Sequence, residues 1–253
     1  MQLNMRRQKR ICCKVKKDVL YTEISIADDG IGIFNSIRQY ADQQLHIKMD
    51  TAQARMELYK GKFTTSPESH SGEGIFFTSK MLAQFALWSE DVMYSNRCDD
   101  EAKFVRSHLI AYYTKLNRIG TMVQMKLEND TKRTAREVFD MFAPLGEGVV
   151  KTLIPMKEFC RQGEPVARSQ ARRILSRLEE FKEVIFDFSE IDFMGQGFAD
   201  EIFRVFQNRH PDIVLTVNNA NEEVADDTTC KKQRKPLVFV IPAADILDEM
   251  CAL

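Results

Sequence analysis

One short apolar segment, residues 183–188, most constrains what this chain of 253 residues can fold into. Apart from two acidic residues it consists of β-branched and aromatic side chains, a composition typical of a strand buried inside a sheet. An amphipathic helix is expected before it, over residues 166–181, and another after it, over 198–206. A further strand is expected over 213–217. Because strands and helices alternate, this region is predicted to have an α/β fold.

The N-terminal half mixes strands and helices in the same way. The expected elements are strands over 10–16 and 19–27, helices over 33–40 and 51–59, a loop over 61–74, a helix over 76–85, a strand from residue 87, and a strand near 118–127. The fold class is therefore α/β throughout.

Polar breaks at residues 128–132 and 144–148 indicate a domain boundary. A linking helix is expected over 133–142, and a strand over 149–154 begins the second domain. The predicted division is a first domain over 1–130, a linking helix and linker over 131–147, a second domain over 148–229, and a basic linker and tail of unassigned role over 230–253.

Charge and cysteine content exclude several classes of protein. Lys plus Arg number 36 and Asp plus Glu number 37, so the chain lacks the basic excess of a general nucleic-acid binder. No apolar run is long enough for a membrane span, and no signal peptide is expected. The six cysteines form no CxxC pair, which favours a reduced, cytoplasmic setting without a disulfide framework or zinc site.

Two glycine-containing segments carry the clearest chemical signal. Asp28, Gly30 and Gly32 follow a strand, and Gly72 and Gly74 precede a helix. Glycine lets the backbone approach a ligand closely, and a helix N-terminus offers unpaired N–H groups to phosphate. A carboxylate at a strand end can accept from an exocyclic amine, so the pair suits a purine nucleotide. Each segment alone is more often an ordinary turn, and neither matches the P-loop or dinucleotide fingerprint.

These segments resemble the glycine boxes of the GHKL ATPases, the superfamily of gyrase, chaperone, histidine-kinase and mismatch-repair ATPases. Residues 28–32 resemble the first box, residues 71–76 the second, and Gly120 with Thr121 the third. Residues 63–68 followed by 71–74 are most similar to the anti-sigma-factor serine kinases. The resemblance covers about residues 10–128 and implies a two-layer α/β (Bergerat-type) sandwich.

The resemblance also implies a set of site residues. Asp28 would bind adenine, Gly30 and Gly32 would shape the pocket, and residues 62–74 would form an ATP lid. The implied ATP-binding residues are Asp28, Gly30, Gly32, Lys62, Thr64, Thr65, Ser71, Gly72, Glu73, Gly74 and Thr121.

The match departs from the family at the metal-binding helix. In the family this helix precedes the first strands and carries an Asn for Mg²⁺, whereas residues 1–27 resemble strands and hold only Asn4. We therefore expect a domain without its first helix, with ATP or ADP as ligand, Mg²⁺ without its usual protein ligand, and no assigned catalytic residue.

The second half resembles the STAS domain, the anti-anti-sigma fold. Residues 182–197 are similar to its central strand and loop, and the resemblance covers about residues 148–225. The phosphoacceptor serine of ordinary STAS domains would fall near residues 195–197, where this chain has no serine. Ser189, at the strand end, is expected to cap the turn.

Several polar residues are expected to have ordinary structural roles. Arg168, Arg172 and Arg173 are expected on a solvated helix face, pairing with Glu179 and Glu180. Asp200 and Glu201 are expected at a polar helix edge. The four histidines lack companions at metal-ligand spacing; they are His46, His70, His108 and His210.

The sequence thus predicts an ATP-binding signalling protein that couples nucleotide binding to a protein partner through a STAS-like domain. Two alternatives remain: a protein serine or histidine kinase completed by an upstream helix, and a non-enzymatic interaction scaffold. Membrane and nucleic acid are not expected as partners.

Overall fold

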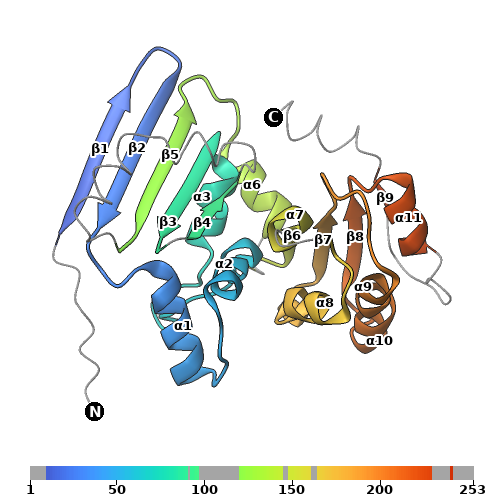
Figure 1. Ribbon diagram of the computed structural model, residues 1–253. Helices are drawn as coiled ribbons and strands as arrows, with labels where there is room; N and C mark the ends of the chain where they lie inside the picture. Colours follow the sequence, from blue (N-terminus) through green and yellow to red (C-terminus); the bar gives the residue numbers. More distant parts are fainter. Residues whose placement is uncertain are drawn as a thin grey trace. The chain divides into compact units, whose positions relative to one another are not determined.

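The computed structural model describes residues 10–90, 92–96, 120–144, 148–160, 164–229 and 240–241 (Figure 1). The chain divides into two compact units, Met1–Ala135 and Arg136–Leu253. The division falls within residues 131–147, the predicted linking helix and linker. Each unit combines a sheet with helices, so the predicted α/β class is confirmed.

The first unit contains an antiparallel sheet with the strand order β1-β2-β5-β3-β4 (Figure 1). Its strands are β1 (Ile11–Lys17), β2 (Tyr21–Asp28), β3 (Gln84–Ser89), β4 (Val92–Ser95) and β5 (Met122–Glu128). Hairpins join β1 to β2 and β3 to β4, and β5 is inserted between the two hairpins. The central strand of the sheet is therefore the last one in this unit's sequence.

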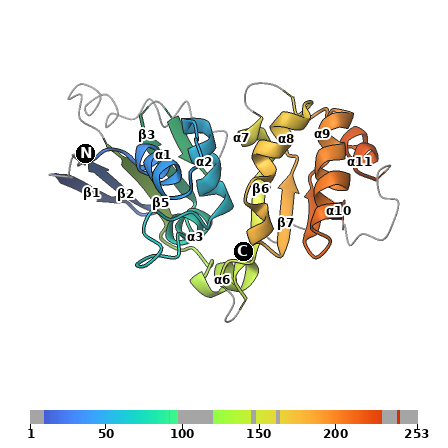
Figure 2. The same cartoon turned by 90° about the horizontal axis from the view of Figure 1, so that it is seen from below.

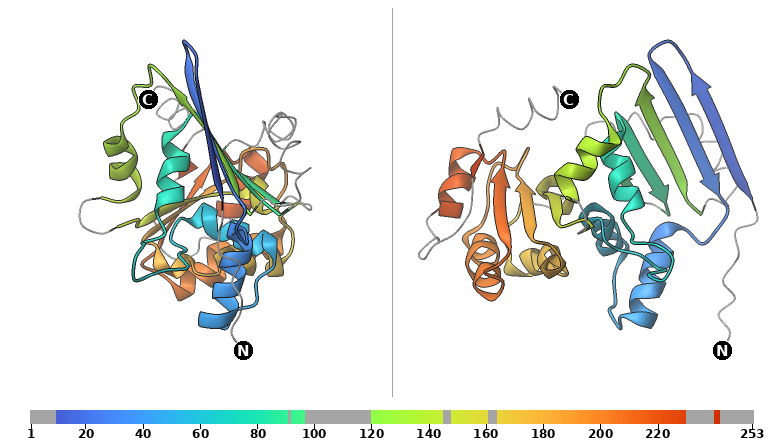
Figure 3. Two further views of the ribbon diagram at one scale, coloured as in Figure 1. Left: turned by 90° about the vertical axis from the view of Figure 1, so that its left-hand side faces the viewer. Right: turned by 180° about the vertical axis from the view of Figure 1, so that it is seen from behind.

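Three helices belong to the same unit: α1 (Ile33–Gln44), α2 (Thr51–Lys60) and α3 (Gly74–Met81). Helix α2 begins in a capping box, in which the Asp50 carboxylate accepts from Gln53 N and the Gln53 side chain accepts from Asp50 N. It ends at Gly61, whose φ of 90° is left-handed. Helix α2 packs on α1 and β4, and α3 packs on β3, next to one edge of the sheet (Figure 3).

The tip of the β1–β2 hairpin is held by Asn129. The Asn129 side chain donates to the carbonyl oxygens of Asp18 and Val19, and its backbone N–H donates to Leu20 O. The Asp18 carboxylate accepts from Leu20 N and Tyr21 N, and these bonds lower the pKa of Asp18. The turn is thus ordered although Val19 and Leu20 are exposed.

The second unit is built on a parallel sheet of β6 (Lys151–Pro155), β7 (Glu183–Asp187), β8 (Val214–Asn218) and β9 (Val240–Ile241), in that order. Its helical segments are α6 (Ala135–Phe142), α7 (Met156–Phe159), α8 (Arg168–Leu175), the 3₁₀ turn η2 (Leu178–Glu180), α9 (Gln196–Asp200), the π-helical η3 (Glu201–Phe206), α10 (Gln207–Arg209) and α11 (Glu222–Thr229). Figure 2 shows α8, α9 and α10 beside the strands of this unit. As predicted, residues 183–187 form a buried strand inside the sheet.

Two helix predictions need correction. The helix expected over 76–85 ends at Met81, and Phe85 lies in β3. The helix expected over 166–181 ends at Leu175, because Ser176 is not helical and Arg177 has a left-handed φ of 62°. None of the helices in the described ranges has the length and apolar content needed to cross a bilayer.

Candidate functional site

The end of β2 is tied to the start of β5 by Asp28. Asp28 N donates to Thr121 O, and Asp28 O accepts from Gly120 N at 2.8 Å. The carboxylate oxygen Oδ1 accepts from Gly30 N at 2.7 Å. The other carboxylate oxygen forms no hydrogen bond with a described residue. One carboxylate oxygen of Asp28 is therefore fixed by Gly30, and the other can accept a hydrogen bond from a ligand.

Glycine is required where these segments meet. A Cβ on Gly120 would lie 2.4 Å from Asp28 Oδ1 and 2.6 Å from Gly30 N and O. Gly32 has a φ of 87°, and a Cβ there would lie 2.4 Å from Ser89 Oγ. The first and third glycine segments therefore pack directly against each other, which only residues without a side chain allow.

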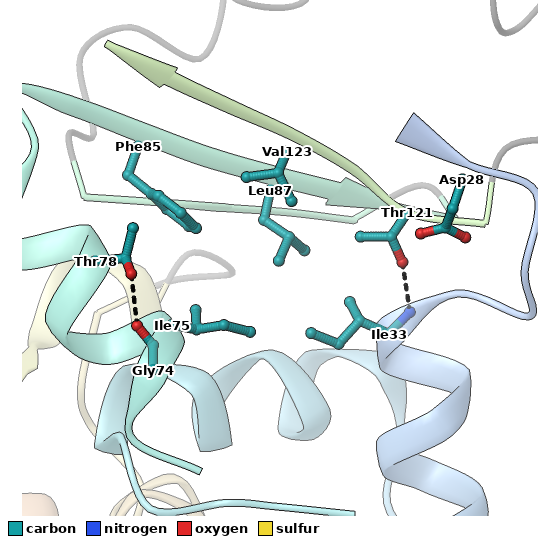
Figure 4. A pocket seen from close by; sticks show the side chains of 9 residues that line it. All are labelled: Asp28, Ile33, Gly74, Ile75, Thr78, Phe85, Leu87, Thr121 and Val123. Atoms are coloured by element: carbon teal, nitrogen blue, oxygen red, sulfur yellow. Dashed lines mark hydrogen bonds between the residues drawn. The ribbon is translucent and has the colours of Figure 1, made fainter. Parts of the chain in front are cut away.

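Thr121 connects the sheet to α1. Its Oγ1 accepts a hydrogen bond from Ile33 N at 3.0 Å (Figure 4). This bond pairs one of the N–H groups that the first turn of a helix leaves without a partner inside the helix. The Thr121 hydroxyl proton remains available to a ligand, and Asp28 lies beside it in the same view.

The residues after α2 form a loop that leads into α3. Gly72 has a φ of 83°, and a Cβ there would lie 2.6 Å from Phe63 O, so the loop folds back on itself. Thr64 Oγ1 accepts from Ser66 N at 3.0 Å, and residues 66–71 are exposed. At Gly74, in contrast, a Cβ would meet nothing within 4 Å. The start of α3 is therefore open.

A cavity of about 350 Å³ lies between the sheet and helices α1 and α3 (Figure 4). Phe85, Leu87 and Val123 form its wall on the sheet side, and Ile33 and Ile75 lie opposite them. The complete lining is Asp28, Ile33, Gly74, Ile75, Thr78, Phe85, Leu87, Thr121 and Val123. The cavity is thus an apolar slot with a carboxylate and a hydroxyl at one end and the start of α3 at the other.

The structure brings only some of the predicted site residues together. Asp28, Gly74 and Thr121 line the cavity, and Gly30 and Gly32 shape the turn beside it. The remaining predicted residues lie in the loop and do not line the cavity; they are Lys62, Thr64, Thr65, Ser71, Gly72 and Glu73.

The apolar lining was not foreseen from the sequence. Phe85 and Leu87 alternate with Ala86 along β3, a pattern that indicates a shared face, whereas the sequence pattern predicts a helix through residue 85. In the described part of the chain, no three or more His, Cys, Asp or Glu side chains gather in a group that could hold a metal ion.

The buried Cys160, in the second unit, has its pKa raised to about 12 by desolvation, which keeps it a neutral thiol.

The three arginines of α8 lie on an exposed helix face, as predicted, and two of them pair with carboxylates farther along the chain. Arg168 pairs with Asp200 at 2.9 Å, and Arg172 with Glu201 at 2.8 Å, so the expected pairing with Glu179 and Glu180 is wrong. The Glu201 side chain is 4% exposed and not at a polar edge. Its hydrogen bonds with Arg172 lower the pKa of Glu201 although burial raises it.

The loop after β7 contains no serine at the expected phosphoacceptor position. A Cβ on Gly195 would lie 2.6 to 2.9 Å from atoms of Val166, and Gly195 N donates to Pro165 O. At the strand end, Asp187 Oδ1 accepts from both the backbone N–H and the hydroxyl of Ser189. Asp187 therefore caps this turn, with Ser189 as the donor.

Comparison with known proteins identifies the class of the second unit. Residues 170–225 match the family model described as a STAS-like domain of unknown function (DUF4325). The second unit thus contains a STAS-like domain, as the sequence resemblance implied. No curated protein and no solved structure gave a match.

Proposed function

We propose that the first unit binds an adenine nucleotide in the cavity, as a GHKL-type domain would. The observation that supports this most directly is the meeting of Asp28, Thr121 and Gly74, three separate parts of the sequence, around one apolar slot. Its volume of about 350 Å³ lies within the range of small-molecule sites. We expect the base to lie between the isoleucines of the helices and the side chains of the sheet.

The base would be selected by Asp28. Its second carboxylate oxygen can accept from the exocyclic amine of adenine, and it would repel the carbonyl oxygen of guanine. The phosphates would then extend toward the start of α3, where unpaired N–H groups favour anions. The loop over residues 62–73 would cover them.

We propose further that nucleotide occupancy is passed to a protein partner through the STAS-like domain. A ligand can shift a conformational equilibrium only when it binds one state better than the other. If the loop over residues 62–73 becomes ordered only when nucleotide is bound, its contacts with the nucleotide would provide this difference in affinity between the two states. The setting would be the cytoplasm, with ATP or ADP as the cofactor.

Calorimetric titration with ADP and GDP tests the proposal. We expect ADP to bind more tightly, and Asp28→Asn to lose about 1.5–3 kcal/mol, or roughly a tenfold to hundredfold rise in Kd. Asp29→Asn is the matched control, because the Asp29 carboxylate accepts from Arg10 N and does not line the cavity. Equal affinity for the two nucleotides would disprove base selection, and no binding of either would favour the scaffold alternative.

A further inference from the structure

Four arginines of the second unit gather where α8 packs against α9 and η3 (Figure 2). We call them the arginine cluster; they are Arg168 and Arg172 on α8, Arg204 on η3 and Arg209 on α10. The rest of the unit has the opposite charge, since Asp and Glu outnumber Lys and Arg by seven over residues 136–229. The arginine cluster is therefore a local positive surface on an acidic unit.

Two carboxylates hold the arginine cluster together. Asp200, at the end of α9, accepts from Arg168 Nη2 at 2.9 Å and from Arg204 Nη2 at 2.7 Å. Glu201, the first residue of η3, accepts from Arg172 Nε at 2.8 Å. The Asp200 side chain is only 13% exposed and that of Glu201 only 4%. Each guanidinium is thus fixed from below by a carboxylate that a partner hardly reaches.

Arg209 belongs to the same surface although it forms no ion pair with a described residue. The pKa of Glu201 is lowered first by its hydrogen bonds with Arg172. The positive charges of Arg168 and Arg209 lower it further, so both of these side chains lie near the Glu201 carboxylate.

The arginine cluster has donors and positive charge to spare. A guanidinium has five N–H donors, and the bonds to the two carboxylates use only Nε and Nη2 atoms. The Nη1 atoms of Arg168, Arg172 and Arg204 bond to no described residue, and these side chains are 50–67% exposed. An exposed ion pair adds little stability, so stability alone does not explain a second arginine on Asp200.

The spacing along α8 fits an extended acidic segment. Arg168 and Arg172 are four residues apart, which is about 6 Å along a helix axis. Alternate side chains of an extended segment lie on one side about 6.6 Å apart, so carboxylates at alternate positions can meet both arginines. Glu164 precedes α8, and Glu179 and Glu180 follow it. A long polyanion such as nucleic acid would run onto these acidic residues, whereas a short segment would not.

We infer that the arginine cluster docks an extended segment of a partner protein with Asp or Glu at alternate positions. The inference names the chemistry of the protein partner proposed above for the STAS-like domain and rests on that proposal. It does not depend on nucleotide binding by the first unit. A test without nucleotide can therefore fail while nucleotide binding stands, and the reverse also holds.

A synthetic peptide tests this with the full chain at low salt and no nucleotide. The probe is a labelled peptide of about nine residues in which glutamate alternates with serine, followed by fluorescence anisotropy. We expect it to bind, and added salt should weaken the binding. A peptide of the same composition with its glutamates in one block should bind about threefold more weakly, and one with lysine in place of glutamate should not bind. No binding of the alternating peptide, or equal binding of the block peptide, overturns the inference. So does tighter binding of a single-stranded DNA with the same number of charges.

Three variants locate the binding surface. Arg168→Gln leaves Arg204 on Asp200, and Arg209→Gln breaks no ion pair, so both should retain the unfolding temperature of the parent. Each should weaken the alternating peptide about threefold or more. Arg173→Gln is the matched control, because Arg173 is exposed on the same helix but points about 100° away from Arg172. Its effect should stay below about twofold, and an effect equal to that of Arg168→Gln overturns the inference.

Discussion

Replacement of Gly120 by alanine tests whether the contact between the glycine segments holds the first unit together. The new Cβ would lie 2.4 to 2.6 Å from Asp28 Oδ1 and from the backbone N and O of Gly30. These are not flexible side-chain ends, apart from the carboxylate, so the backbone must move. Gly120 also donates to Asp28 O at 2.8 Å and accepts from Ser89 Oγ at 2.7 Å, and a backbone shift weakens both bonds.

The expected loss of stability follows from these two effects. Overpacking costs about 1–3 kcal/mol and a lost hydrogen bond about 0.5–1.5 kcal/mol, so Gly120→Ala should destabilise the first unit by about 1.5–4.5 kcal/mol. Gly74→Ala is the matched control, because nothing lies within 4 Å of its added Cβ. At a helix start that alanine should be neutral or stabilise by up to about 1 kcal/mol.

Tryptophan fluorescence during urea unfolding measures this difference in the first unit alone. Trp88 is the chain's single tryptophan, and it packs against a cluster of Ala27, Ala86, Met93 and Met122. We expect the midpoint of Gly120→Ala to fall by about 1 M urea or more. A loss of unfolding free energy below about 0.5 kcal/mol in Gly120→Ala, or an equal loss in Gly74→Ala, would refute the packing argument.

Three further outcomes are expected. Arg172→Ala should lower the unfolding temperature of the second unit in calorimetry, because it leaves the buried Glu201 carboxylate unpaired, while the exposed Arg173→Ala should not. Since the pKa of Glu201 is lower in the folded state, this contribution is present above about pH 4.5 and should disappear on acidification through the folded-state pKa; an unchanged difference at acidic pH would contradict the reasoning. Hydrogen exchange over residues 62–73 should slow with ADP and Mg²⁺, and identical protection would count against a lid. ATP turnover should stay near background, and Mg²⁺-dependent hydrolysis that is abolished in Gly72→Ala would show a catalytic group that we have not identified.

Local patterns in the sequence predicted most of the strands and the glycine turns. The alternation in residues 19–27 corresponds to β2, and Gly32 and Gly72 both take left-handed φ values that favour glycine. The apolar run over 76–85 was ambiguous, because helical and strand periodicities both fit it. The structure divides it between α3 and β3.

The rest of the candidate site depends on tertiary contacts that no local pattern encodes. Phe85 and Val123 lie on neighbouring strands only because β5 is inserted between the two hairpins. The partners of Arg172 were misjudged for the same reason: Glu179 and Glu180 are near in sequence, but Glu201 is near in space.

The late position of β5 in the sequence has a consequence for folding during synthesis. The bond between Ile33 N and Thr121 Oγ1 joins residues 88 positions apart, and Ala27 pairs with Met122 across a similar interval. At 5–20 residues per second, a ribosome needs about 5–20 s to make that stretch. During this time the β1–β2 hairpin can form, since its contacts are local, but the edge of β2 that later pairs with β5 has no partner strand. The nascent chain therefore passes through an interval in which chaperone binding to residues 11–28 would protect it from aggregation.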